Sequence, residues 1–520
     1  MRPLPKAIAL VAVLALLAGS GVFGAWMGLR SGGDTNASDQ PAIAPMPSGG
    51  RDADVAPRAA LTRYYDQDVT WTACGHGLQC GHLLVPLDYA HPHGRTISLR
   101  MVMRPASDPG QRVGTLLVNP GGPGAPADTL AQNAPSYFGQ PLLQHFDILG
   151  LNPRGTDGSD PIDCLSNRQL DHYLAMTPVP TTPAQVRSYR HWDDAMGRGC
   201  RRRSGAIADH VSTVEAARDM DVLRAVLGEG RLDYLGFSYG TKLGTTYADL
   251  FPSRVGRFVL DGAIDPELSS RRAQLQQAGG FETALRSYVR HCVASGGCFL
   301  GGSLHAGLAR IQAFLRQDRA LPAGDGRTLH AGDAVYGLVM ALYDRGLWTY
   351  LDQGLQQAFR GDGRTLMWLA DLYSTRRAEG GYETNLLEAN YDINCLDDPW
   401  SVPVDKVSSV LPAFERASPT FGAVFAWMAT ACSGSGFTRP VPEPPVGAPG
   451  ADPIVVVGTT RDPATPYAGA KALASELDSG VLVTRDGDGH TGYHAGNACV
   501  DHAVEGYLVS GVAPRDGLSC

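Results

Sequence analysis

A pentapeptide near the middle of this 520-residue chain, Gly236-Phe-Ser-Tyr-Gly240, separates two patterns of different period. The apolar run Leu232-Asp-Tyr-Leu235 before it is typical of a buried strand, and the segment from Leu243 to Leu250 has apolar residues at helical spacing. A serine at such a strand-to-helix turn has an exposed hydroxyl, and only small residues fit two positions before and after it. The segment therefore predicts Ser238 as a nucleophile, with the amide of Tyr239 directed at a developing oxyanion.

A second turn is rich in glycine and follows an earlier strand pattern. The run Thr115-Leu-Leu-Val-Asn119 predicts a buried strand, and it leads into Pro120-Gly-Gly-Pro-Gly124. An oxyanion needs a second preorganised N–H donor, and exposed glycine backbone at such a turn supplies one. We expect Gly122 to be this donor.

A serine hydroxyl needs a base to remove its proton, and the base needs a carboxylate to orient it. When the serine stands on a turn of this kind, the acid and then the histidine follow it in the chain. Asp462 follows the strand pattern Pro453-Ile-Val-Val-Val457, and His490 follows Val481-Leu-Val483. The 28 residues between them leave room for one helix and one strand, so we predict Asp462 and His490 as the partners of Ser238.

Five other residues compete for these two roles. Asp452 lies before its strand, Asp486 and Asp488 are too close to the histidine to come from a separate strand, and His502 lies inside a helical pattern. His494 is the one rival base that stays open.

The alternation of short apolar runs with helical patterns predicts an α/β protein with a mostly parallel central sheet and flanking helices. Between about Pro266 and Pro440 the helical patterns dominate, which predicts an inserted helical cap. Together with the serine turn, these features predict an α/β-hydrolase fold. The expected organisation is a signal peptide or N-terminal membrane anchor in 1–30, a disordered linker in 31–60, core in 61–265, cap in 266–440 and core again in 441–520.

The first thirty residues have the pattern of an export signal. Arg2 and Lys6 precede an apolar run over 7–29 that is also long enough to span a bilayer. We therefore expect a secreted protein, or one anchored at the outer face of the cell membrane by a tether through 7–29.

The chain has ten cysteines, all beyond this segment, which suits an oxidising compartment. The spacing favours five disulfides, although sequence alone leaves the connectivity open: Cys74–Cys80, Cys164–Cys200, Cys292–Cys298, Cys395–Cys432 and Cys499–Cys520. No Cys-x-x-Cys pair occurs and the histidines do not cluster with the cysteines, so we expect no metal site. The net charge of −8, spread along the chain, argues against nucleic acid as a partner.

These motifs together resemble the proline-iminopeptidase-like branch of serine peptidases, and more closely the secreted tripeptidyl aminopeptidases of actinobacteria. The matching segments are Asn119-Pro-Gly-Gly-Pro-Gly124, Asp147-Ile-Leu-Gly-Leu-Asn-Pro-Arg-Gly155, Gly236-Phe-Ser-Tyr-Gly-Thr241 and the stretch from Pro453 to Cys520. Two positions depart from the pattern: Pro120, where the proline iminopeptidases usually have histidine, and Asn152, where aspartate is common. The first departure weakens a narrow proline specificity.

The resemblance implies an exopeptidase that acts on peptide substrates with a free N-terminus. Such an enzyme needs no metal and no organic cofactor. A substrate ammonium is held well by a buried carboxylate, and the acidic segment from Glu388 to Asp398 looks like the family's Cys-x-Asp segment. We expect Asp397 to take this role, with Glu388 and Asp392 behind it. The alternatives are a carboxylic ester hydrolase with the same three catalytic residues and a catalytically inactive binding protein.

Overall fold

The computed structural model describes residues 56–317, 319–433, 435–437 and 442–520. The expected signal or anchor of 1–30 and most of the expected linker of 31–60 lie outside this part of the chain. Within it, no helix combines the length and the apolar character needed to cross a bilayer.

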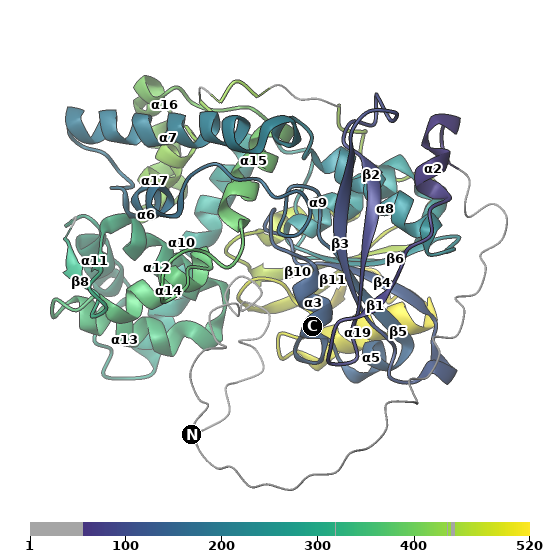
Figure 1. Cartoon of the computed structure of the whole chain (residues 1–520). Coiled ribbons are helices and arrows are strands. Elements are labelled where there is room, and N and C mark those ends of the chain that lie inside the picture. Colours follow the sequence, from purple (N-terminus) through teal and green to yellow (C-terminus); the bar gives the residue numbers. More distant parts are fainter. Residues whose placement is uncertain (1–55, 318, 434, 438–441) are drawn as a thin grey trace, which may run out of the picture.

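A ten-stranded sheet forms one half of the molecule (Figure 1). Its central strands pair in parallel, and β2 and β3 pair antiparallel at one edge. In spatial order the strands are β1 (Thr72–Ala73), β2 (Gln79–Pro86), β3 (Thr96–Arg104), β5 (Phe146–Leu151), β4 (Gly114–Asn119), β6 (Leu232–Phe237), β7 (Val255–Asp261), β10 (Ile454–Arg461), β11 (Gly480–Asp488) and β12 (Leu518–Ser519).

Both faces of the sheet are buried, which explains the unbroken apolar runs of its central strands. Alternate residues of β10 show the two faces: Val456 packs with one core cluster, whereas Val455 and Val457 pack with another. The first face is covered by α8 (Thr213–Val226), α9 (Tyr239–Leu250) and α18 (Tyr467–Glu476). The second is covered by α3 (Asp128–Gln132), α4 (Ala134–Tyr137), α5 (Gln140–His145) and α19 (Ala498–Ser510).

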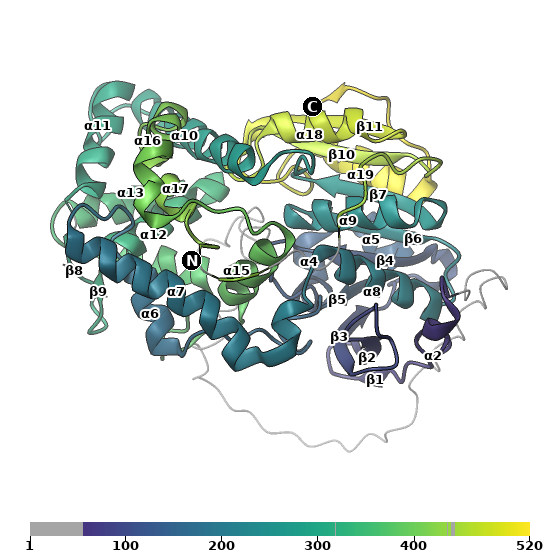
Figure 2. The same ribbon diagram turned by 90° about the horizontal axis from the view of Figure 1, so that it is seen from above.

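A helical body forms the other half and has its own apolar core (Figures 1 and 2). Most of it is inserted between β7 and β10: α10 (Ser270–Ala294), α11 (Leu304–Leu315), α12 (Ala331–Tyr343), α13 (Trp348–Ala358), α14 (Arg364–Ser374), α15 (Leu386–Asp397), α16 (Val407–Ala417) and α17 (Gly422–Met428). Two earlier helices, α6 (Asn167–Ala175) and α7 (Pro183–Ser204), also lie in this body, where α6 contacts α12 and α7 contacts α15. The helical body is therefore built from two separate excursions of the chain.

The five expected disulfides are all present. Two of them hold the helical body together: Cys164–Cys200 joins α7 to the loop after β5, and Cys395–Cys432 joins α15 to the segment after α17.

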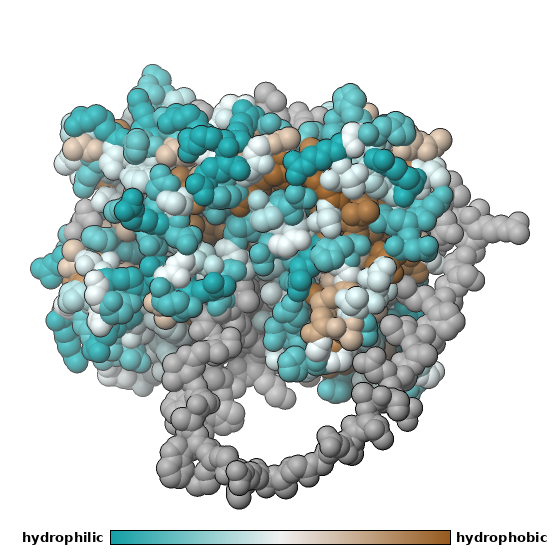
Figure 3. Space-filling model, in the orientation of Figure 1, coloured by the Kyte–Doolittle hydropathy of each residue, from teal (hydrophilic) through white to brown (hydrophobic). Residues whose placement is uncertain are grey.

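Figure 3 shows hydrophilic side chains over most of the visible face, with hydrophobic atoms in recessed areas between them.

Candidate active site

Ser238 lies on the turn between β6 and α9, as the sequence predicts. Its backbone has φ 55° and ψ −123°, a conformation that costs about 1–3 kcal/mol and is found most often at functional sites. Small neighbours make the turn possible: a methyl group at Gly236 would lie 2.5 Å from the carbonyl oxygen of Gly240. The serine side chain is half-buried at the carboxyl end of the sheet.

The glycine-rich turn after β4 packs directly against this serine. A methyl group at Gly121 would lie 3.0 Å from Cβ of Ser238 and 3.0 Å from the amide nitrogen of Tyr239. The Gly121 amide donates to Oδ1 of Asn119 at 2.9 Å, whereas the Gly122 amide donates to no described residue. The Tyr239 amide is the first of α9 and has no acceptor within the helix. The Tyr239 amide therefore lies next to the serine, and the Gly122 amide belongs to the turn that packs against it.

Asp462 follows β10 directly, and His490 follows β11. Nδ1 of His490 lies 2.9 Å from each carboxylate oxygen of Asp462, which also accept the amides of Ala464, Thr465 and Thr491. The carboxylate is buried, and its contact fixes the orientation of the imidazole. Nε2 of His490 is buried and has no hydrogen-bond partner among the described residues, so the Ser238–His490 hydrogen bond is not formed here. Such bonds often tighten only when substrate is bound.

The helical body contacts the histidine directly. The carbonyl oxygen of Tyr343, the last residue of α12, accepts the His490 amide at 2.7 Å. The Tyr343 ring packs edge-on against the imidazole, with 5.3 Å between ring centroids. Tyr343 could not be predicted from the sequence, because its partner lies far away in the chain. Thr465 was not predicted either, although its place just after Asp462 was a usable signal; its hydroxyl lies 3.2 Å from Nδ1 of His490.

The competing residues have other partners. Asp452 pairs with Arg231, and Asp486 and Asp488 both pair with Arg461. The ring of His502 lies against the carbonyl oxygen of Ala498 within α19, and the amide of His494 donates to Asp501.

The three acids expected to bind a substrate ammonium all lie on α15, where they have different surroundings. Oε1 of Glu388 accepts the amides of Cys164 and Leu165, at 2.6 and 2.7 Å. Asp392 is fully buried, and neither of its carboxylate oxygens has a hydrogen-bond partner among the described residues. Burial raises the pKa of Asp392 to about 8, with a further contribution from the carboxylate of Asp209.

Asp397 is held by core residues on two helices. Its oxygens accept the Thr213 amide at 2.8 Å, the Thr213 hydroxyl at 2.5 Å and the Lys242 ammonium at 2.8 Å. Burial alone would lower the pKa of Lys242, but the carboxylates of Asp397 and Glu443 raise this pKa above its ordinary value. The hydroxyl of Tyr239 lies 2.6 Å from that of Thr213, so Asp397 connects α15 to the serine turn.

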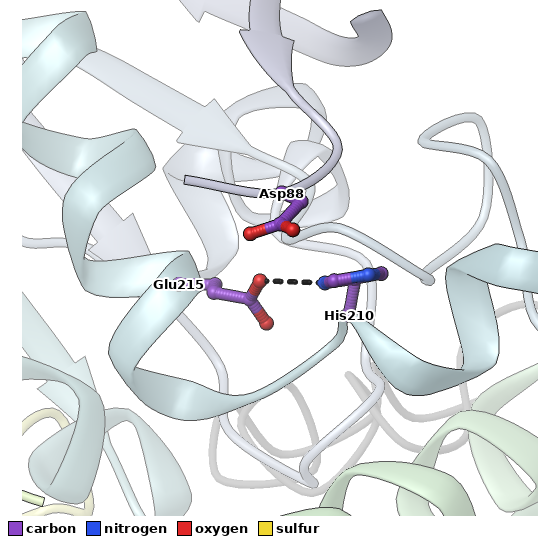
Figure 4. Close-up of side chains that lie close together, drawn as sticks. All are labelled: Asp88, His210 and Glu215. Carbon is purple, nitrogen blue, oxygen red and sulfur yellow. Dashed lines mark hydrogen bonds and ion pairs between the residues drawn. The ribbon is translucent and has the colours of Figure 1, made fainter. Parts of the chain in front are cut away.

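One cluster outside this site has side chains that can ligate metal ions. The ligand atoms of Asp88, His210 and Glu215 lie within 4.8 Å of one another (Figure 4). Each already has a partner of opposite charge or a hydrogen bond: Glu215 pairs with His210 at 3.0 Å and with Arg154 at 3.6 Å, and Asp88 pairs with His91 at 2.6 Å. The hydrogen bond with Glu215 raises the pKa of His210. We therefore interpret these side chains as local ion pairs, Asp88–His91 within the β2–β3 loop and His210–Glu215 at the start of α8.

The parallel sheet, the serine turn and the carboxylate–histidine pair at the ends of two later strands define the class of α/β-hydrolases. Serine protease Hip1 of Mycobacterium tuberculosis is 36% identical to this chain over 478 residues, which cover 87% of this chain and 91% of that protein. Carboxylesterase B of the same organism is 35% identical over 459 residues, covering 85% and 86%. Tripeptidyl aminopeptidase of Streptomyces coelicolor is 29% identical over 462 residues, covering 85% and 83%.

A family described as TAP-like protein matches residues 418–520, which contain both Asp462 and His490. Given this match and the extent of similarity to the relatives, the chain belongs to the TAP-like family of α/β-hydrolases. The expected fold and the expected family are confirmed.

Proposed function

We propose that this enzyme is a serine exopeptidase that removes short peptides, three residues long, from a free N-terminus. The observation that carries the proposal is the Asp462–His490 pair beside a strained serine turn, in a chain related over most of its length to a serine protease and a tripeptidyl aminopeptidase. A relative named carboxylesterase B makes ester hydrolysis the second candidate.

The proposed mechanism is acyl transfer. His490 takes the proton of Ser238 as the hydroxyl oxygen attacks the scissile carbonyl carbon, and Asp462 stabilises the resulting imidazolium. The amides of Gly122 and Tyr239 bind the developing oxyanion. His490 then protonates the leaving amine, and a water molecule hydrolyses the acyl-enzyme by the same steps. These steps need neither a metal nor an organic cofactor.

Recognition of a free amine requires a carboxyl group whose oxygens are not already occupied by donors of the protein. Glu388 and Asp397 accept hydrogen bonds from protein donors, whereas the described part of the chain places no donor on either oxygen of Asp392. We therefore assign the substrate ammonium to Asp392, with the other two acids holding α15 in place. Burial favours the neutral form of Asp392, so an arriving ammonium must displace its proton.

Replacing Asp392 with asparagine should raise KM for a free-amine tripeptide arylamide roughly tenfold, because a charge-assisted hydrogen bond is lost. In the wild type, KM should also rise as the pH falls from 8 to 6, since the pKa of Asp392 is about 8 and the protonated acid binds no cation. In Asp392→Asn this dependence should disappear. An unchanged KM at pH 8 would show that Asp392 does not hold the ammonium. The control is Asp405→Asn, which removes an exposed carboxylate of the same helical body that lies beside Lys406.

The peptidase and esterase candidates separate in one panel of substrates. Arylamides of one, two and three residues, each with a free or an acetylated amine, are compared with a short-chain aryl ester. The exopeptidase proposal expects turnover of the free-amine tripeptide arylamide and loss of turnover on acetylation. Turnover that ignores acetylation, or that is far higher for the ester, would favour the esterase.

We also propose that the enzyme is exported. Five disulfides support an oxidising compartment, and the apolar run over 7–29 would act as a signal or a tether. Sequencing the N-terminus of the protein recovered from culture medium and from membranes would separate these two outcomes.

A further inference from the structure

Asp261, the last residue of β7, contacts both the serine turn and the histidine loop. In the sheet it pairs with Phe237 of β6, the residue before the nucleophile. Its backbone carbonyl oxygen accepts the Ser238 amide at 2.8 Å. The position of the nucleophile along the sheet is therefore fixed by the backbone of Asp261.

The side chain of the same residue holds the loop that carries His490. It is fully buried, and its Oδ1 accepts the Gly492 amide at 2.8 Å while its Oδ2 accepts the Tyr493 amide at 2.7 Å. These amides come two and three residues after the histidine. Asp462 orients the imidazole ring, whereas Asp261 anchors the backbone on which the ring stands.

The peptide that follows Asp261 packs closely against the histidine ring. A methyl group at Gly262 would lie 3.2 Å from Cε1 of His490, so the ring edge packs against the peptide that follows Asp261. Within the loop, Thr491 has φ 68°, an unfavourable conformation for a β-branched residue that persists only when anchored from outside.

We propose that Asp261 is a positioning residue that sets the separation of Ser238 and His490, through its carbonyl oxygen on one side and its carboxylate on the other. This inference rests on the proposed triad. An aspartate suits the role because both of its oxygens accept the two amides. An asparagine has one acceptor oxygen, and its NH2 group would face a backbone N–H, donor against donor.

The test is Asp261→Asn, assayed at pH 8 beside Asp233→Asn and Ser238→Ala. Asp233 is the matched control because it lies on β6, near the opposite end from Ser238, and its carboxylate also accepts a backbone amide, that of Arg257. In Asp261→Asn we expect kcat to fall roughly 10- to 100-fold with KM within threefold, since a misplaced base affects the transition state more than substrate binding. The rate of covalent labelling of Ser238 by diisopropyl fluorophosphate should fall by a similar factor, and Asp233→Asn should leave both quantities within twofold of wild type.

A folded Asp261→Asn enzyme with a kcat within twofold of wild type would overturn the inference, as would an equal loss in Asp233→Asn. If Asp261→Asn does not fold, Gly262→Ala makes the same test, because its methyl group presses on the His490 ring; full kcat in that variant would overturn the inference. Activity that survives in Ser238→Ala would instead refute the proposed triad.

Discussion

Replacing Ser238 with alanine should lower kcat by roughly 10⁴- to 10⁶-fold and leave the fold intact. Without the hydroxyl no acyl-enzyme can form, and the residual rate comes from the oxyanion donors and from substrate binding alone. The serine side chain is half-buried at a turn whose geometry is set by the surrounding backbone, so the melting temperature should change little. The measurement is arylamide hydrolysis with active-site titration, beside circular dichroism of both proteins.

A serine of the helical body provides the control for this substitution. Ser409 is exposed on α16, and Ser409→Ala removes an equivalent hydroxyl far along the chain from the turn. Ser409→Ala should retain wild-type activity. A Ser238→Ala enzyme within 100-fold of wild type would exclude Ser238 as the nucleophile.

Asp462→Asn should lower kcat by roughly 10³- to 10⁴-fold, with KM little changed. An asparagine keeps the size of the side chain but donates a hydrogen bond toward His490 Nδ1, which favours the wrong tautomer and removes the charge that stabilises the imidazolium. The loss should be measured as kcat on the same arylamide, with fluorophosphate labelling to count intact sites.

Asp488→Asn is the control for the acid. Asp488 lies two residues before the histidine and pairs with Arg461 and with the hydroxyl of Ser287, so it should tolerate the change. A larger loss in Asp488→Asn than in Asp462→Asn would show that the wrong carboxylate had been assigned.

The parts of the site that follow local rules could be predicted from the sequence. A serine between a strand pattern and a helix pattern indicates a tight strand-to-helix turn. Asp462 and His490 each follow a strand pattern, which indicates that they lie at the same edge of the sheet as Ser238. The segment from Leu243 to Leu250 predicted a helix after Ser238, and α9 covers it, because apolar residues repeat there at helical spacing. The signal for β10 and β11 was shorter than the strands, because each continues beyond its apolar run into polar residues near the site.

Features that depend on distant partners could not be predicted. Strongly charged α7 has a weak apolar pattern, and its place in the helical body depends on contacts with α15 about 200 residues later. The acidic residues of α15 were visible, but their partners were not: Lys242 is 155 residues from Asp397, and Thr213 is 184 residues away. The sequence therefore located the acidic segment, but it could not separate Glu388 and Asp397, which bond to other parts of the fold, from Asp392, whose oxygens have no partner among the described residues.

Digestion of a decapeptide tests the central claim most directly. The peptide is supplied with a free and with an acetylated N-terminus, and the products of the wild type and of Ser238→Ala are identified by mass spectrometry. We expect successive loss of tripeptides from the free-amine peptide, no cleavage of the acetylated peptide, and no products from Ser238→Ala. Internal cleavage of the acetylated peptide, or no cleavage of either peptide by an enzyme that hydrolyses esters, would contradict the exopeptidase assignment.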